Sequence, residues 1–406
     1  MSGIGERWRV LSGSDNWEGL LEPLDSDLRR YLIHYGTMVA PASNSFIDEP
    51  ASKYVGLSRY ARKNLLAKCG VAKGNPFKYE VTKYFYATSG FPIGARTGYT
   101  VSPARVDAVL RESNWNGYIA VATDEGKVAL GRRDILVVWR GTRRFLEAIT
   151  DITLVFVNAP LIFGQNSHPL VHKGFYDMYT TTIQDSQLNR MSARDQIREE
   201  VARLVELYKD EDISITVAGH SLGASMATLN AVDLAANPIN HNKHVPVTAF
   251  LYASLKVGDE NFKNAFSNQQ KNLRALRISD ANDPFPKFPE SAPMEGKINP
   301  KIPYVDVGVG LVIESKKSHY LKDLEGLSYH DLMLYMHGID GYQGSRGGFE
   351  RQGDFDLARV NRYQGALKDE YRIPTEWFNI KDKGMVQQDD GNYILDDHEV
   401  DEDETF

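Results

Sequence analysis

Residues 213–235 read ISITVAGHSLGASMATLNAVDLA, a pattern that indicates a strand, a sharp turn and a helix in succession. Its first five residues alternate between β-branched apolar and hydroxyl side chains, which predicts a strand. Residues 222–236 are rich in Ala, Leu and Met and contain no proline, which predicts a helix. Between the two lies Gly219-His220-Ser221-Leu222-Gly223, a sharp strand-to-helix turn that presents the serine hydroxyl at a helix N-terminus.

This turn suits a nucleophile. Glycines two residues before and two residues after Ser221 leave room for the bend, and a helix N-terminus favours developing negative charge. The bare G-x-S-x-G pattern is weak evidence in a chain with 33 glycines. The strand before the turn and the helix after it supply the expected context, so Ser221 is the predicted nucleophile.

Composition excludes several classes of protein. The 406 residues carry a formal net charge of −7, whereas a nucleic-acid-binding protein should present a basic face. The single cysteine, Cys69, forbids an intrachain disulfide and fits a reducing compartment. Residues 1–9 lack the apolar core of a secretory signal, and no run of about eighteen apolar residues occurs, so we expect a cytoplasmic protein without a transmembrane segment. No zinc-type ligand spacing is present, and we expect neither a metal nor another cofactor.

Predicted helices and strands alternate along the chain, which indicates an α/β fold with a largely parallel sheet and helices on both faces. Strands are expected at residues 79–86, 117–123, 135–139, 213–217, 247–253 and 273–278, a turn at 124–126, and an amphipathic helix capped by Ser192 at 193–208.

We expect three regions along the chain. Residues 1–75 form a helical extension packed on the core, residues 76–345 form the core, and residues 346–406 form a C-terminal extension that ends in an acidic, solvated tail. The apolar residues 145–163 fit two interpretations equally well, namely part of the core or a mobile flap that contacts acyl chains.

A serine hydroxyl needs a base, and the base needs an orienting carboxylate. In this kind of sheet the acid and then the base follow the serine along the chain, each after a strand. Asp280 and Asp283 both follow the strand at 273–278. Prolines on the C-terminal side of Asp283 rigidify its loop, so Asp283 is the predicted acid and Asp280 a loop-capping residue.

Four histidines lie downstream of the predicted acid. His319 falls in a Lys-rich loop and His398 in the acidic tail, whereas His330 directly precedes an apolar helix that would hold it firmly. His330 is the predicted base, with His319 and His337 as alternatives. Because a base must be neutral, we expect activity to fall at low pH.

An oxyanion requires two donors. The first predicted donor is the N–H of Leu222, the residue after the nucleophile. The second comes from the loop after a neighbouring strand, where Gly141 and Thr142 directly follow residues 135–139. His172 and His220 are interpreted as structural residues.

Several motifs together resemble a known family. The elbow at 219–224 and the blocks Val138-Trp139-Arg140-Gly141-Thr142, Val171-His172-Lys173-Gly174-Phe175 and Asn282-Asp283-Pro284-Phe285-Pro286 are similar to the class 3 lipases. Residues 8–17, 28–36, 112–118 and 387–391 resemble, more narrowly, the plant phospholipase A1-II branch, so the resemblance covers nearly the whole chain.

The resemblance implies an α/β-hydrolase fold and metal-free hydrolysis of the sn-1 acyl ester of glycerolipids. It carries the triad onto Ser221, Asp283 and His330, and the oxyanion residue onto Thr142. Two loops depart from the family pattern, at residues 254–258 and at Pro284, which leaves substrate preference open.

The resemblance also implies peripheral, reversible contact with a glycerolipid membrane or micelle, for which we expect residues 145–163 and 20–24 to provide the surface. A mono- or diacylglycerol lipase of the same mechanism is the first alternative. A non-catalytic, lipase-like binding or signalling protein is the second.

Overall fold

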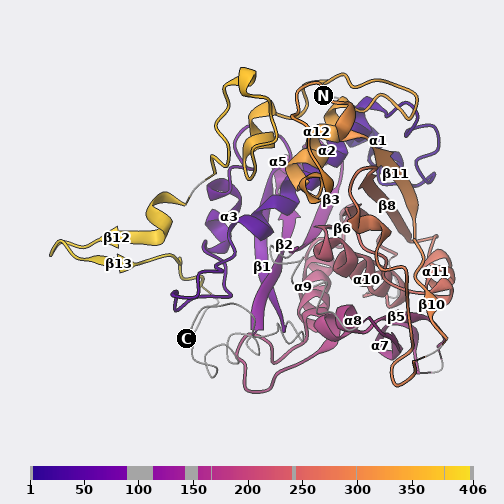
Figure 1. Ribbon diagram of the computed structural model, residues 1–406. Coiled ribbons are helices and arrows are strands. Elements are labelled where there is room, and N and C mark those ends of the chain that lie inside the picture. Colours follow the sequence, from indigo (N-terminus) through magenta and orange to yellow (C-terminus); the bar gives the residue numbers. More distant parts are fainter. Residues whose placement is uncertain are drawn as a thin grey trace.

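The computed structural model describes residues 3–88, 113–141, 154–165, 167–239, 244–298, 300–378 and 380–402. At its centre lies a seven-stranded sheet, in the order β1 (Tyr79–Thr88), β2 (Ser113–Ala122), β3 (Arg133–Trp139), β6 (Ile213–His220), β7 (Val247–Tyr252), β8 (Leu273–Asp280) and β11 (Val309–Ile313) (Figure 1). Within this sheet, neighbouring strands from β3 to β11 pair in parallel, whereas β1 with β2 and β2 with β3 pair antiparallel. The predicted α/β fold with a largely parallel sheet is confirmed.

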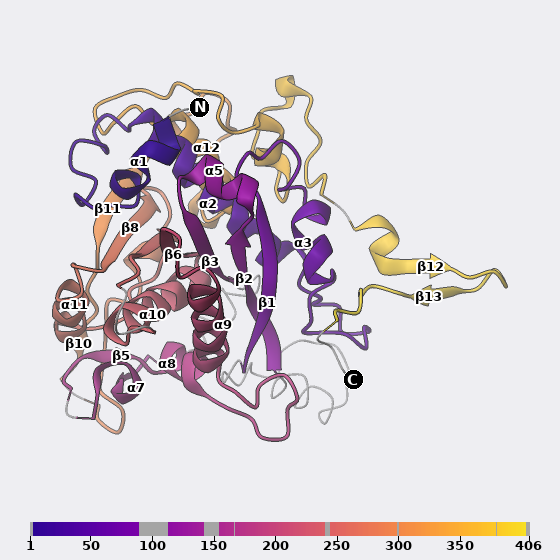
Figure 2. The same ribbon diagram turned by 180° about the vertical axis from the view of Figure 1, so that it is seen from behind.

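Helices cover both faces of this sheet (Figures 1 and 2). Residues of α2 (Ser26–Asn44) and α12 (Leu332–Gly341) share one hydrophobic core with one face of the sheet, and residues of α9 (Ala193–Leu207) and α10 (Leu222–Ala236) share a second core with the other. Within the described ranges, every helix is too short or too polar to cross a membrane.

Shorter elements complete the fold. They are α1 (Gly3–Leu11), α3 (Arg62–Lys68), α5 (Asp124–Leu130), β4 (Phe156–Asn158), α7 (Pro160–Phe163), β5 (Leu170–His172), α8 (Lys173–Thr180), α11 (Glu260–Ser267), β9 (Ser291–Ala292), β10 (Ile302–Pro303), β12 (Met385–Gln387), β13 (Tyr393–Leu395) and the 3-10 helices η1 (Phe285–Lys287), η2 (Ser315–Lys317), η3 (Gly326–Tyr329), η4 (Leu357–Asn361), η5 (Asp369–Tyr371) and η6 (Lys381–Gly384).

Two helix starts show how local sequence acts. The predicted cap of α9 is confirmed, because Ser192 Oγ accepts from the N–H of Asp195 at 3.1 Å. The predicted turn at residues 124–126 is wrong, since these residues begin α5. The hydroxyl of Thr123 accepts from the N–H of Gly126 at 3.2 Å, and Gly131, with φ of 75°, ends the helix.

A buried carboxylate fastens α2 to the sheet. Asp134 of β3 is fully buried and accepts from the hydroxyl of Tyr35 at 2.8 Å and from that of Tyr79 at 2.7 Å. Its other oxygen accepts from the hydroxyls of Ser214 and Thr216 on β6. Because a buried charge is costly unless it is hydrogen-bonded, these partners hold α2 in one position against the sheet.

Three acidic residues of the predicted tail contact the body, so the prediction that the tail is solvated is wrong for Asp397, Glu399 and Asp401. Asp397 is buried and accepts from the hydroxyl of Ser52 at 2.9 Å, and Asp401 pairs with Arg62 of α3 at 2.8 Å. Glu399 also forms an ion pair with Lys68. Between the body and this docked segment, β12 and β13 form a hairpin that projects outward (Figures 1 and 2).

Candidate active site

Ser221 occupies a strained corner between β6 and α10. Its φ of 59° and ψ of −130° are unusual for a residue with a side chain. The two flanking glycines are required here. A Cβ on Gly219 would lie 2.3 Å from the backbone of Gly223, and one on Gly223 would lie 2.4 Å from the carbonyl oxygen of Trp139. The local sequence therefore forms the sharp turn that a nucleophilic serine needs.

The three predicted triad side chains lie in hydrogen-bond contact. His330 Nε2 lies 2.8 Å from Ser221 Oγ, and His330 Nδ1 lies 2.7 Å from Asp283 Oδ2. Ser221 is 3% exposed and the Asp283 side chain is fully buried. With Nδ1 donating to the carboxylate, Nε2 can accept the serine proton, which is the geometry that general-base catalysis requires.

Asp283 is held by further donors on both of its oxygens. The N–H of Phe285 donates to Oδ1 at 2.9 Å, and the hydroxyl of Tyr335 donates to Oδ2 at 2.7 Å. Tyr335 is absent from the sequence prediction. The only sequence signal for its role is its position five residues after His330, in the helix that follows the base. The first turn of this helix places the Tyr335 hydroxyl against Asp283.

The other acidic candidate, Asp280, serves the loop. Its Oδ1 accepts from the N–H of Asn282 at 2.9 Å, and its Oδ2 accepts from the N–H of Ser315 at 2.9 Å. These bonds join the end of β8 to the chain after β11, so Asp280 caps the loop that carries Asp283.

The alternative histidines make contacts away from Ser221. His337 Nε2 lies 2.7 Å from the hydroxyl of Ser318, and burial lowers the pKa of His337 to about 3. The ring of His319 lies against Tyr320, and His398 Nδ1 contacts the carbonyl oxygen of Ser58 at 2.7 Å. Of the downstream histidines, His330 is the one that the structure brings to the serine.

The two remaining candidate histidines, His172 and His220, have structural contacts. His172 Nδ1 caps α8 by accepting from the N–H groups of Gly174 and Phe175. The buried ring of His220 lies 4.8 Å from that of His330, centre to centre. Burial, followed by the nearby His330, lowers the pKa of His220 well below its usual value, so His220 stays neutral beside the base.

One of the two predicted oxyanion donors can be located. Leu222 is the first residue of α10, where backbone N–H groups lack helical partners. Thr142 lies outside the described residues. The residue before it, Gly141, packs on the elbow, because a Cβ there would lie 2.8 Å from the carbonyl oxygen of His220 and 3.7 Å from Ser221 Cβ.

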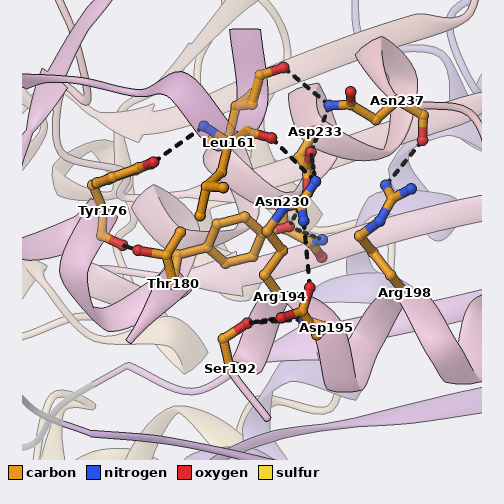
Figure 3. A network of polar contacts seen from close by, with 12 residues as sticks. Leu161, Tyr176, Thr180, Ser192, Arg194, Asp195, Arg198, Asn230, Asp233 and Asn237 are labelled. Atoms are coloured by element: carbon orange, nitrogen blue, oxygen red, sulfur yellow. Dashed lines mark hydrogen bonds and ion pairs between the residues drawn. The ribbon is translucent and has the colours of Figure 1, made fainter. Parts of the chain in front are cut away.

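Part of the apolar segment at residues 145–163 belongs to the core. Residues 142–153 lie outside the described ranges, but Phe156 and Ile162 are buried, whereas Leu161 of α7 is 50% exposed. The backbone of Leu161 is fixed, since its N–H donates to the hydroxyl of Tyr176 at 3.2 Å and its carbonyl accepts from Arg194 at 3.1 Å (Figure 3).

This polar network reaches α10, the helix that begins after Ser221. Arg194 of α9 pairs with the buried Asp233 of α10 at 2.8 Å (Figure 3), and Asn237 donates to the carbonyl oxygen of Ile162 at 3.0 Å. The network therefore holds α7, α9 and α10 together on one side of the sheet.

Asp331 caps α12 directly after the predicted base. Its carboxylate accepts from the N–H groups of Met333 and Leu334 at 2.8 and 3.0 Å. Burial nevertheless raises the pKa of Asp331 to about 6. Because the folded-state pKa lies above that of the unfolded chain, the stability linked to this group is present below about pH 4 and is lost as the pH rises to about 6.

Replacing Asp331 by asparagine should therefore stabilise the protein at high pH. Asparagine keeps a capping oxygen but carries no charge. Because Asp331 is partly exposed, we expect a gain of only ~1 kcal/mol in the free energy of unfolding at about pH 8, and almost none at about pH 4. Urea unfolding at the two pH values measures this difference, and an equal effect at both would contradict the assignment.

Across the described residues, no cluster of histidine, cysteine, aspartate and glutamate could hold a metal ion. The site consists of a hydroxyl, an imidazole, a carboxylate and a helix N-terminus. Such a set can attack an ester or amide carbonyl and stabilise the resulting oxyanion.

Comparisons with known proteins point in the same direction. A family model described as Lipase (class 3) matches residues 136–292. The chain is 44% identical to Phospholipase A1-II 4 of Oryza sativa subsp. japonica over 403 residues, with 98% of this chain and 97% of that protein covered. It is 42% identical to Phospholipase A1-IIalpha of Arabidopsis thaliana, with 100% and 95% covered.

Solved structures give a more distant likeness. The Lip2 lipase of Yarrowia lipolytica matches with a TM-score of 0.44 and 19% identity, over 71% of this chain and 80% of that chain. The lipase of Rhizopus microsporus var. chinensis matches with a TM-score of 0.40 and 18% identity, over 71% and 81%.

Proposed function

The chain belongs to the phospholipase A1-II group of the class 3 lipases, which are carboxylic ester hydrolases, and we propose that it cleaves the sn-1 acyl ester of glycerophospholipids with Ser221 as its nucleophile. The observation that carries the proposal is the pair of hydrogen bonds from Ser221 to His330 and from His330 to Asp283, at 2.8 and 2.7 Å. An ordered relay of this kind makes a serine hydroxyl reactive.

In the acylation half of the reaction, Ser221 Oγ attacks the ester carbonyl while His330 Nε2 accepts its proton. Asp283 stabilises the resulting imidazolium through Nδ1. The N–H of Leu222, together with Thr142, stabilises the oxyanion. His330 then returns the proton to the glycerol oxygen, so the lysophospholipid leaves and the acyl group stays on Ser221.

Deacylation repeats these steps with water. His330 removes a proton from a water molecule that attacks the acyl-enzyme carbonyl, and the same donors stabilise the second oxyanion. The proton then passes back to Ser221 Oγ, which frees the fatty acid and restores the enzyme.

We place the lipid-contacting surface at α7 and at the loop after Asp283. Leu161 is 50% exposed and Phe288 is 45% exposed, and the backbone of Leu161 is held by the network of Figure 3. These two exposed apolar side chains support peripheral, reversible binding to a membrane or micelle. The net charge of −7 makes strong attraction to anionic lipids unfavourable.

On phosphatidylcholine vesicles with different chains at the two positions, we expect release of the sn-1 chain to exceed that of the sn-2 chain by about tenfold or more. Mass spectrometry of the fatty acids released at early times measures this ratio, before acyl migration scrambles the product. Equal release would contradict the proposal.

Diacylglycerol with the same two chains is the comparison substrate. We expect it to be hydrolysed more slowly than the phospholipid, and faster hydrolysis would favour a mono- or diacylglycerol lipase. Phosphatidylcholine dispersed below its aggregation threshold should be cleaved more slowly than phosphatidylcholine in vesicles, because a peripheral enzyme acts at the lipid surface.

We place the protein in the cytoplasm. The single cysteine, Cys69, is buried and forms no disulfide, which fits a reducing compartment. Cell fractionation tests this placement, and recovery in an oxidising compartment would contradict it.

A further inference from the structure

Tyr335 joins three parts of the candidate active site through one hydroxyl. Its side chain projects from α12, the helix that begins two residues after His330, and it is fully buried. The hydroxyl donates to Asp283 Oδ2 at 2.7 Å and accepts from the N–H of Asp280, at the end of β8, at 3.1 Å. The helix behind the base is therefore tied both to the acid and to the strand that carries the acid.

The same oxygen of Asp283 receives two donors. Oδ2 accepts from His330 Nδ1 and from the hydroxyl of Tyr335, each at 2.7 Å. A carboxylate buried away from water is stabilised mainly by such donors. The pKa of Tyr335 is raised well above its usual value, first by burial and then by the charge of Asp283, so the hydroxyl stays protonated and remains a donor.

We propose that Tyr335 is a positioning residue of the reaction. Its hydroxyl keeps Asp283 Oδ2 oriented toward His330 Nδ1. By donating a hydrogen bond to this oxygen, it also weakens the electrostatic attraction between the carboxylate and the imidazole. This inference rests on the proposed hydrolase function and adds a residue that acts only through Asp283 and His330, without contact to substrate.

The Tyr335→Phe variant keeps the ring and loses only the hydroxyl. Without the tyrosine donor, the negative charge of Asp283 Oδ2 interacts more strongly with the protonated imidazole of His330. The imidazolium is then more stable, so a higher pH is needed to form the neutral base. We expect the acidic limb of the pH–rate profile to move upward by about half a pH unit. We also expect kcat to fall about tenfold, or about 1.4 kcal/mol, with KM unchanged.

Tyr179→Phe is a matched control in α8, whose hydrophobic core lies on the face of the sheet opposite to that of α12. The hydroxyl of Tyr179 donates to the buried Asp233 at 2.9 Å and accepts from Asn230 at 3.0 Å. Like Tyr335, it is a fully buried tyrosine between a carboxylate and an N–H donor, but it lies outside the triad. Its loss should lower stability without moving the pH–rate profile.

A third variant keeps the hydroxyl and so keeps the fold. Site-specific 3-fluorotyrosine at position 335 is a stronger hydrogen-bond donor, and it should move the acidic limb to lower pH, opposite to the effect of phenylalanine. All rates are measured on a soluble p-nitrophenyl butyrate ester, so that binding to lipid does not enter.

Opposite shifts in the two Tyr335 variants, with none in the Tyr179 variant, would support the inference. A Tyr335→Phe profile that superimposes on that of the wild type, or a fluorotyrosine profile that does not move, would overturn it while leaving the proposed function intact. A wild type without Ser221-dependent turnover would overturn the proposed function and this inference with it.

Discussion

The Asp283→Asn variant is expected to keep its fold and to lose about 10⁴-fold in kcat. An amide cannot satisfy both sets of donors around Asp283. With its NH₂ toward His330, it would force the imidazole to carry its proton on Nε2, which could then no longer accept from Ser221. With its NH₂ on the other side, it would face the N–H of Phe285, which now donates to Oδ1 at 2.9 Å.

Asp280→Asn is the control for this prediction. The carboxylate of Asp280 accepts from Asn282 and Ser315 and so closes the loop. These hydrogen bonds do not involve His330. We expect a loss of about 1–2 kcal/mol in the free energy of unfolding and less than about tenfold in kcat. Steady-state kinetics on a soluble ester decides between the two carboxylates. An inactive Asp280 variant beside an active Asp283 variant would reverse their roles.

The Ser221→Ala variant is expected to lose at least about 10⁴-fold in kcat, since no other group supplies the attacking oxygen. Its thermal unfolding should stay close to that of the wild type, because the hydroxyl bonds only to His330 in the described structure. Ser225→Ala is the matched control. That serine lies one turn further along α10, is fully buried, and donates to the carbonyl oxygen of Leu255 at 3.3 Å. Comparable residual turnover in the two variants would contradict the role of Ser221.

The parts of the fold that could be predicted are those encoded locally. The strand, elbow and helix around Ser221 follow from alternation, glycine spacing and helix propensity within a single stretch. The expected chain order of serine, acid and base then limits the candidate acids and bases to residues after Ser221. The prolines after Asp283 favour it over Asp280 as the acid. No local pattern, however, states the distance between residues 109 positions apart, such as Ser221 and His330.

The features that could not be predicted depend on distant partners. The acidic tail has the composition of a solvated segment, yet Asp401 lies against Arg62, 339 positions away in the chain. The role of Tyr335 depends on how α12 is rotated toward Asp283, which periodicity alone does not specify. The helix α5 was missed for a different reason. Thr123 and Gly131 are local signals for the start and the end of a helix, but the Asp-Glu-Gly sequence at 124–126 resembles a turn and led to the wrong prediction.

The role of Thr142 and the division of the chain into three regions stay predictions, as do the catalytic roles of the triad residues. Thr142 directly follows Gly141, which packs against the elbow, and we expect Thr142 to donate to the oxyanion. The division into an N-terminal extension up to residue 75, a core up to residue 345 and a C-terminal extension also stays a prediction.

We infer that the hydroxyl of Ser221 is made reactive by His330 and Asp283. Reaction of the wild type with an alkyl fluorophosphonate, followed by peptide mass spectrometry, tests it most directly. We expect one phosphonyl group per chain, on Ser221, and labelling at least about 10³-fold slower in His330→Ala. Labelling at another residue, or labelling of Ser221 at an unchanged rate without His330, would contradict it.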